Sequence, residues 1–370
     1  MNTPFLELGR ESKRYRREIQ TAVGRVTERG RYILGAEVEA LEKELAEYCD
    51  VPFAVGVGTG TDALSLALES SGVLNPGEGD EVITPALSSG FTALSIYLAG
   101  AIPRFVDVDL RTLQIDPEAI AAATGPRTRA IVPVHLYGNA CDIEAIRCLA
   151  ERYSLTLIED ACQAHGSRWR GNLLGTFGVA GCFSFYPTKN LGALGDGGML
   201  VTRNEETYRR ARSLRHGGQI RIHYHELLGR NSRLDEIQAA ILRFKLQNLE
   251  AWNQVRRRIA DVYTQSLADL DLNIIQPGVD TVPNRHLYVV RCRQRDRLVD
   301  FLSGRGIETL VHYPVPVPHQ PAFQRFLLPE QQFPVATAAS REILSLPLYP
   351  ELKSSEQEYI VSSIRAFFGK

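Results

Sequence analysis

The chain has 370 residues, of which 44% are hydrophobic and 23% are charged, as is typical of globular proteins with a sizeable core. Its 42 basic and 43 acidic residues give a formal net charge of −1, so the composition provides no overall attraction to nucleic acid or to a membrane surface. No apolar run approaches the ~20 residues of a membrane span, and the polar N-terminus lacks a secretory signal, so we expect a cytoplasmic protein.

Between Pro52 and Thr202 short apolar runs alternate with helical segments. Seven runs have the length and composition of strands: Phe53–Val57, Glu81–Thr84, Arg104–Val108, Ala130–His135, Leu155–Glu159, Cys182–Tyr186 and Met199–Thr202. Helices are expected between most of them, for example over Asp62–Ser70, Asp116–Ala123 and Ile143–Tyr153. This alternation predicts an α/β fold with a mostly parallel seven-stranded sheet and helices on both faces.

The chain changes character after this region. A long helix is expected from about Leu234 to Ile259, followed by a strand over Leu287–Arg293 and by helices near Asp296–Gly304 and Glu356–Phe368. A chain of this length exceeds one ordinary core. We therefore predict a large α/β domain over residues 1–250 and a small C-terminal α+β domain over residues 251–370.

The first candidate site is a glycine-rich turn between a strand and a helix. The strand Phe53–Val57 runs into Gly58-Thr59-Gly60-Thr61-Asp62, where a helix begins. Free backbone N–H groups at a helix N-terminus form an anion site suited to phosphate. Such a turn also serves nucleotides or simple close packing, so taken alone it leaves the ligand open.

The second candidate site follows the apolar strand that begins at Leu155. This strand runs into Glu159-Asp160, and Gln163-Ala164-His165-Gly166 come next. Ligands of open α/β sheets bind outside the carboxyl ends of the strands, where an acid is well placed for chemistry. A carboxylate can keep a pyridine nitrogen protonated, although a strand-end aspartate more often caps a helix or a loop.

The third candidate site is Lys189, which lies just past an apolar strand in the run Ser184–Gly198. Glycines at 192, 195, 197 and 198 allow close approach of the backbone to a ligand. A desolvated lysine loses its proton readily and can form a Schiff base with a carbonyl. The alternative for this motif alone is a surface lysine in a glycine-rich turn.

An anion cradle, a strand-end carboxylate and a strand-end lysine, in this order, are what a pyridoxal phosphate site requires. The chain resembles the DegT/DnrJ sugar aminotransferases, which have fold type I of the pyridoxal phosphate enzymes, within the aspartate aminotransferase superfamily. The resemblance is strong from about Leu34 to about Asn253 and looser to the C-terminus. It rests on six motifs: Gly58–Leu64, Val134–Gly138, Glu159–Asp160, Gln163–Gly166, Ser184–Gly198 and Gly229–Ala240.

The resemblance implies a role for each residue of the cofactor site. Lys189 would form the Schiff base and then move the proton between substrate and cofactor carbons, while Asp160 would pair with the pyridine nitrogen. Gln163 would contact the phenolic oxygen of the ring. The hydroxyl of Ser184 and the backbone of Gly60 and Thr61 would bind the phosphate, although without the family Ser184 would be interpreted as an ordinary strand hydroxyl.

A homodimer with shared active sites is a further implication. Asn231 and Arg233 resemble a pair that reaches from the partner subunit to the phosphate, although by itself the segment Gly229–Asn231 would be only a turn before a helix. The N-terminal segment, residues 1–33, is expected on the side of the substrate or of the dimer. One departure concerns the aromatic residue or histidine that stacks on the cofactor ring in relatives: Ser89 occupies its position, and Phe91 is a possible substitute or a core residue.

For the reaction, the resemblance implies transfer of an amino group from glutamate to a keto-deoxyhexose linked to dTDP or UDP. The motif Lys189–Gly198 and the run Asn231–Gln238 favour carbon 3 over carbon 4. The loop that starts His312-Tyr313-Pro314 and ends at His319 matches a loop of the substrate pocket in relatives, so His312, Tyr313 and His319 are candidate substrate contacts. Its alternative is a rigid surface loop with solvated histidines.

Three other interpretations remain. A pyridoxal phosphate sugar dehydratase would carry histidine in place of Lys189, and a non-catalytic regulator would have no need of Lys189, Asp160, Gln163 and Ser184 together. A dinucleotide-dependent enzyme is disfavoured because Gly56, Gly58 and Gly60 miss the Gly-x-Gly-x-x-Gly spacing. The six cysteines show no Cys-x-x-Cys pair and indicate reduced thiols, and Cys162 is a weak candidate for a nucleophile. The histidines at 216, 223 and 225 lack the spacing of a metal site.

Overall fold

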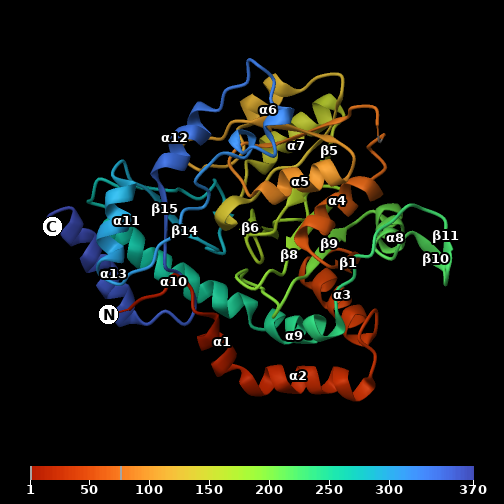
Figure 1. Ribbon diagram of the computed structural model, residues 1–370, viewed down its shortest axis with the longest axis horizontal. Helices are drawn as coiled ribbons and strands as arrows, with labels where there is room; N and C mark the ends of the chain where they lie inside the picture. The colour runs from red at the N-terminus through yellow and green to blue at the C-terminus, as the bar shows by residue number, and fades with distance from the viewer. Residues whose placement is uncertain (1, 76) are drawn as a thin grey trace.

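The main element of the fold is a seven-stranded sheet. The computed structural model describes residues 2–75 and 77–370. The strand order is β1, β9, β8, β5, β4, β2, β3, with bounds Phe53–Val57 (β1), Gly198–Thr202 (β9), Ala180–Ser184 (β8), Thr156–Asp160 (β5), Thr128–Ile131 (β4), Glu81–Pro85 (β2) and Ile102–Val106 (β3). β9 is antiparallel to β1 and β8, and the other neighbouring pairs are parallel. The predicted mostly parallel sheet is confirmed (Figure 1).

The register of the sheet brings the ends of β1, β5 and β8 to one edge. Gly198 of β9 pairs with Val57 on one side and with Ser184 on the other. Asp160, the last residue of β5, pairs with Cys182 two residues before the end of β8. The glycine turn after β1, the acid of β5 and the lysine turn after β8 therefore share the carboxyl edge, where α/β folds bind their ligands.

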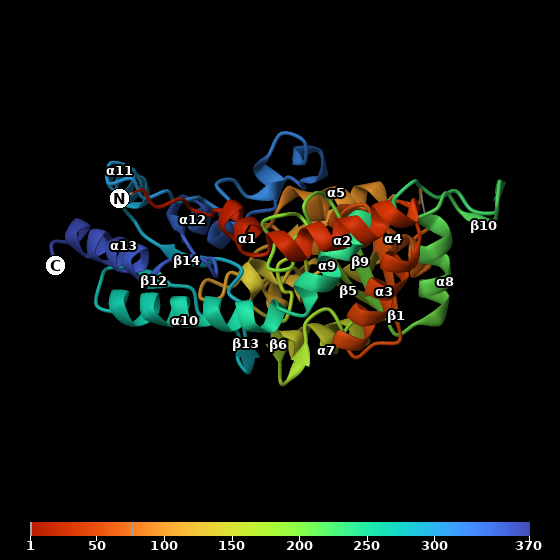
Figure 2. The same ribbon diagram turned by 90° about the horizontal axis from the view of Figure 1, so that it is seen from below.

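Helices cover both faces of the sheet, as predicted, because successive strand residues are buried on opposite sides. On one face Val55 and Ile158 belong to a core with α4 (Gly60–Ser70), α5 (Gly90–Leu98) and α8 (Glu205–Leu214). On the other face Ala54 and Leu157 belong to cores with α3 (Ala36–Tyr48), α9 (Glu236–Leu246), α6 (Pro117–Ala123) and α7 (Ile143–Tyr153). Figure 2 shows α5 and α7 on opposite sides of β5.

Several predicted boundaries need correction. The strand expected over Arg104–Val108 starts two residues earlier, and the one expected over Ala130–His135 ends at Ile131, two residues before Pro133, which has no N–H for the ladder. The long helix expected over Leu234–Ile259 is two helices, α9 and α10 (Leu249–Leu267). It breaks because the Asn248 side chain donates to the carbonyl oxygen of Phe244 at 3.0 Å, which ends the first helix.

A second, smaller sheet lies in the C-terminal part of the chain. It consists of β12 (Asn273–Ile274), β14 (Tyr288–Arg291) and β15 (Ile343–Leu346), all antiparallel. α10, α11 (Arg295–Ser303) and α13 (Ser354–Phe367) share a separate hydrophobic core with it. α10 begins at Leu249, next to the predicted domain boundary at residue 250, and the two-domain division itself stays a prediction.

The N-terminal segment contacts both parts. Thr3 pairs with Ile307 beside the smaller sheet, and after α1 (Leu8–Arg14) the helix α2 (Arg16–Arg29) packs on α9 through Ala22 and Val26. The remaining short elements are β6 (Arg168–Trp169), β7 (Asn172–Leu173), β10 (Gln219–Arg221), β11 (Tyr224–His225), β13 (Thr281–Val282), α12 (Pro334–Glu342) and the 3₁₀ turns Leu136–Gly138, Val317–His319 and Gln324–Phe326. Within the described ranges, no helix has the length and apolarity needed to cross a membrane.

Candidate active site

The anion cradle lies at the start of α4. The Thr59 hydroxyl caps the helix by accepting the N–H of Asp62 at 3.0 Å, which leaves the N–H groups of Gly60 and Thr61 at the helix entrance. Gly60 lies directly against Ser184, since a Cβ at Gly60 would come within 2.6 Å of the Ser184 Cβ. The structure thus brings together the three residues predicted to bind phosphate, and the contact requires a glycine.

Asp160 is buried at the end of β5, with 4% of its surface exposed. Its Oδ2 accepts a hydrogen bond from the Thr92 hydroxyl at 2.8 Å, and its Oδ1 accepts one from the N–H of Cys162 at 3.1 Å. Two fixed donors, one to each oxygen, orient the carboxylate at the edge of the sheet.

Lys189 lies in the turn that follows β8, where its N–H donates to the carbonyl oxygen of Tyr186 at 2.8 Å. Burial lowers the pKa of Lys189, while the nearby Cys162 and Asp160 oppose this shift. A lowered pKa increases the fraction of neutral amine, the form that attacks carbonyls. Burial, reinforced by the charge of Asp160, raises the pKa of the Cys162 thiol, which disfavours this cysteine as a nucleophile.

Gln163 is held so that its amide nitrogen faces the site. Its Oε1 accepts the backbone N–H of Tyr137 at 2.7 Å, and its Nε2 donates to the hydroxyl of Tyr313 at 3.1 Å. Because the backbone group is a donor, the amide oxygen must face Tyr137 and the NH₂ group must face the other way. Gln163 can therefore donate to a phenolic oxygen, the contact that the sequence predicts for it.

A network of buried polar side chains, not anticipated from the sequence, supports the lysine turn. Asn190 donates to Asn253 Oδ1 at 2.8 Å and to the carbonyl oxygen of Asn284 at 3.1 Å, and its Oδ1 lies 3.1 Å from His286 Nδ1. Asn253 in turn donates to the carbonyl oxygen of His165 at 2.9 Å. Asparagines usually lie on the surface, so no sequence signal pointed to their burial.

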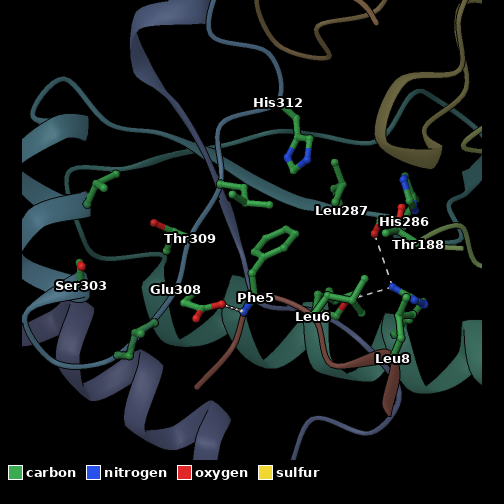
Figure 3. A pocket seen from close by; sticks show the side chains of 15 residues that line it. Phe5, Leu6, Leu8, Thr188, His286, Leu287, Ser303, Glu308, Thr309 and His312 are labelled. Atoms are coloured by element: carbon green, nitrogen blue, oxygen red, sulfur yellow. Dashed lines mark hydrogen bonds between the residues drawn. The ribbon is translucent and has the colours of Figure 1, made fainter. Parts of the chain in front are cut away.

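A cavity of about 560 Å³ opens beside the lysine turn, between the N-terminal segment and the C-terminal part of the chain. Figure 3 shows Phe5 within it and Thr188, His286 and His312 along one side. Burial, together with the nearby charge of Lys189, lowers the pKa of His312 to about 4. The size of the cavity suits a small-molecule ligand.

The three candidate substrate residues are placed differently. His312 lines the cavity and its Nδ1 lies 2.9 Å from the Ser345 hydroxyl, while Tyr313 reaches Gln163. His319 is exposed on the 3₁₀ turn Val317–His319 and is not among the cavity residues. The structure therefore brings two of the three to the cofactor residues or to the cavity.

Asn231 and Arg233 lie on either side of Ser232 in the extended segment that precedes α9. Ser232, between them, points into its own subunit: its hydroxyl accepts the N–H of Gly58 at 2.9 Å and donates to Asp62 at 2.8 Å. Side chains alternate along an extended segment, so Asn231 and Arg233 point the opposite way. Asn231 is exposed, and Arg233 contacts His216 at 3.3 Å. Ser232 was not among the residues proposed from sequence.

The structure places Ser89 and Phe91, the two residues near the position that stacks on the cofactor ring in relatives. Ser89 caps α5 by accepting the N–H of Phe91, and Phe91 is 65% exposed. Phe91 is therefore not a core residue, which removes one of the two interpretations of it.

The described residues fit pyridoxal phosphate. They combine N–H donors and a hydroxyl for a phosphate, a buried carboxylate for a ring nitrogen and an amine with a lowered pKa for a carbonyl. A model of the DegT/DnrJ/EryC1/StrS aminotransferase family matches residues 13–365. The chain belongs to this family. The family expected from sequence, and with it the aminotransferase class, is confirmed.

Known members of the family are similar over nearly the full length. A dTDP-3-amino-3,4,6-trideoxy-α-D-glucose transaminase of Streptomyces venezuelae is 44% identical, covering 98% of this chain and 95% of its own. A pleiotropic regulatory protein of Geobacillus stearothermophilus is also 44% identical, covering 100% and 99%. The crystal structure of S. venezuelae DesV with a ketimine intermediate superposes with a TM-score of 0.96 at 43% identity, covering 100% and 99%.

A further solved structure bears on the cofactor. NtdA from Bacillus subtilis, solved with bound pyridoxamine phosphate, has a TM-score of 0.92 at 30% identity and covers 100% of this chain and 86% of its own. Membership of an aminotransferase family with such structural neighbours implies pyridoxal or pyridoxamine phosphate as the cofactor. The fold-type I architecture predicted from sequence is confirmed by the DesV superposition.

Proposed function

We propose that this protein transfers the amino group of glutamate to carbon 3 of a keto-deoxyhexose linked to dTDP or UDP. The observation that carries the proposal is the meeting of three groups at one edge of the sheet: the Gly60–Ser184 contact, the buried Asp160 and the lysine turn. Carbon 3 is supported by the relative from S. venezuelae, whose name specifies a 3-amino sugar nucleotide.

Each residue of the site has a proposed task. Pyridoxal phosphate, when bound, supplies a carbonyl that exchanges amines and a ring that withdraws electrons. Lys189 is the proposed point of attachment and, once released, the base that moves a proton between the reacting carbons. Asp160 keeps the ring nitrogen protonated, and Gln163 donates to the phenolic oxygen. Ser184 and the N–H groups of Gly60 and Thr61 bind the phosphate.

The cavity of Figure 3 is the proposed entrance for the substrates. His312 and Tyr313 lie between this cavity and the cofactor residues, which supports their role as contacts for the sugar or the diphosphate. Their lowered and raised pKa values, both caused first by burial, keep the imidazole and the phenol neutral near pH 7. Neutral hydrogen-bonding groups suit recognition of sugar hydroxyls. For His319, only the sequence motif supports a role in substrate binding.

The proposed active unit is a homodimer with shared sites. Asn231 and Arg233 point away from their own α4 entrance, as the inward direction of Ser232 requires. The adjoining β10–β11 hairpin projects from the body of the subunit in both views (Figures 1 and 2) and carries the exposed Ile220, Ile222 and Tyr224. Apolar side chains this exposed indicate a surface that another molecule covers. We place Arg233 of the partner subunit at the phosphate.

Amino transfer from glutamate to a panel of dTDP- and UDP-linked keto-deoxyhexoses tests the proposal, with the aminated carbon located by NMR. A 3-amino product supports it, and a 4-amino product would reassign the position within the family. Loss of a hydroxyl without amine transfer would indicate the dehydratase instead. Absence of all turnover by cofactor-loaded protein would favour a regulatory role, as the name of one relative suggests. The six free cysteines fit the reducing cytoplasm, where we expect the enzyme to act.

A further inference from the structure

Two hydroxyl groups form a row of hydrogen bonds to Asp160, the carboxylate that the proposed function assigns to the cofactor ring. Thr92 lies in the first turn of α5, and its Oγ1 is 2.8 Å from Asp160 Oδ2. Ser88 lies just before the helix, and its Oγ is 3.2 Å from the Thr92 Oγ1. Asp160, Thr92 and Ser88 are all buried, with 4%, 3% and 2% of their surfaces exposed. The three side chains therefore interact with one another rather than with bulk water.

The chemistry of the three groups fixes the direction of these hydrogen bonds. An ionised carboxylate only accepts, so the single hydroxyl proton of Thr92 is committed to Asp160. The Thr92 oxygen then remains as an acceptor, and the Ser88 hydroxyl must donate to it. The result is a one-way chain from Ser88 to Thr92 to Asp160, in which each bond polarises the next.

The chain leaves Asp160 with defined free positions. A carboxylate has about four lone-pair directions, of which Thr92 takes one on Oδ2 and the N–H of Cys162 takes one on Oδ1. The rotation of the carboxylate is fixed because both oxygens are held by groups on different elements, α5 and the turn after β5. The remaining lone pairs therefore keep a constant direction.

We propose that Thr92 is a positioning residue for the transamination reaction, with Ser88 as its support. It fixes the orientation of Asp160, so that the carboxylate can hold the proton on the cofactor ring nitrogen. This inference rests on the role proposed for Asp160. Thr92 does not touch the reacting atoms, so its effect must appear in the protonation state of the ring nitrogen as well as in the rate.

Thr92→Val tests the proposal, since valine keeps the shape of threonine and cannot donate. The enzyme is loaded with pyridoxal phosphate that carries ¹⁵N in its ring, and the ¹⁵N chemical shift is followed against pH. We expect the ring nitrogen of Thr92→Val to lose its proton at a lower pH than in the wild type, and the single-turnover rate with glutamate to fall by about tenfold or more. Thr92→Ser, which keeps the hydroxyl, should restore both.

Thr84→Val is the matched control, because Thr84 is equally buried and donates at 3.1 Å to the carbonyl oxygen of Val132 in the same sheet. It should lower Tm without moving the ¹⁵N titration. If Thr92→Val likewise lowered Tm but kept the wild-type titration and rate, Thr92 would be structural only. Asp160→Asn distinguishes failure of the role proposed for Thr92 from failure of the role proposed for Asp160. An unchanged ¹⁵N titration in this variant would overturn the role of Asp160 itself.

Discussion

The two sides of the candidate site are built in opposite ways. On the sheet side, Gly60, Asp160, Ser184 and Lys189 come from the ends of three strands; Gly60 and Asp160 are buried, and Ser184 and Lys189 are half-buried. On the other side, the β10–β11 hairpin projects from the subunit a few residues before Asn231 and Arg233, and Ile222 and Leu228 are 83% and 100% exposed. The sheet side is fixed by the fold of a single chain, whereas the projecting side carries exposed apolar side chains.

This difference suggests that changes on the two sides should act in different ways. The sheet side contains the groups needed for the proposed chemistry, so changes there should affect the reaction directly. The projecting side contains Asn231 and Arg233, whose side chains face away from their own Gly58–Asp62 turn. Changes on that side should act through assembly and through cofactor affinity.

The largest effect is expected for Lys189→Ala. Loss of both the attachment point and the base should remove transamination to the detection limit, a loss of at least about 10⁴-fold. Borohydride reduction of the wild type followed by peptide mapping should place the cofactor label on Lys189. Lys43→Ala, an exposed lysine on α3, is the control and should leave activity unchanged. A label on any other lysine would contradict the assignment.

Asp160→Asn should be the next most severe change. Without the carboxylate the ring nitrogen loses its proton and withdraws electrons less strongly. We expect a ~1000-fold slower proton transfer, which corresponds to roughly 4 kcal/mol of barrier. Single-turnover absorbance changes with glutamate measure this rate. A near-normal rate in a folded variant would mean that Asp160 has a different task.

Gly60→Ala tests the anion cradle. The new methyl group would lie 2.6 Å from the Ser184 Cβ and 3.1 Å from the Cys162 sulfur, so the helix entrance must move away from the serine. Overpacking of this kind costs about 1–3 kcal/mol, and we expect the affinity for pyridoxal phosphate to fall by about tenfold or more. Gly24→Ala in α2 has nothing within 4 Å and should bind the cofactor like the wild type. Equal affinities in the two variants would argue against a phosphate at Gly60.

The smallest effect concerns pH. The folded-state pKa of His312, about 4, lies below its ordinary value of 6.5, so between these values the unfolded chain binds more protons and stability rises with pH. The protein should therefore lose Tm as the pH falls from 6.5 to 4. The Tm of His312→Asn should fall less over the same interval. The difference corresponds to at most about 1.4 kcal/mol in the free energy of unfolding per pH unit. Parallel pH profiles of Tm would show that His312 does not contribute.

The sequence signals for the sheet side of the site are local. Asp160 ends the apolar strand β5 and Lys189 lies in the turn after the apolar strand β8, and parallel strands bring their carboxyl ends to the same edge. The pairings between distant segments could not be predicted. Thr92 and Asp160 are 68 residues apart and Ser232 and Asp62 are 170 apart, and no pattern within either segment points to the other. The break between α9 and α10 was missed because the apolar periodicity continues through Asn248, whose side chain ends the helix.

The most direct test asks whether the two sides belong to different subunits. Arg233→Ala and Lys189→Ala should each be inactive alone. After subunit exchange, half of the dimers in an equal mixture are heterodimers with one intact site, so about a quarter of the wild-type activity should return. A mixture of Asp160→Asn with Lys189→Ala should stay inactive, since both residues belong to the sheet side. Rescue in that control, or none in the test pair despite proven exchange, would contradict a site shared between subunits.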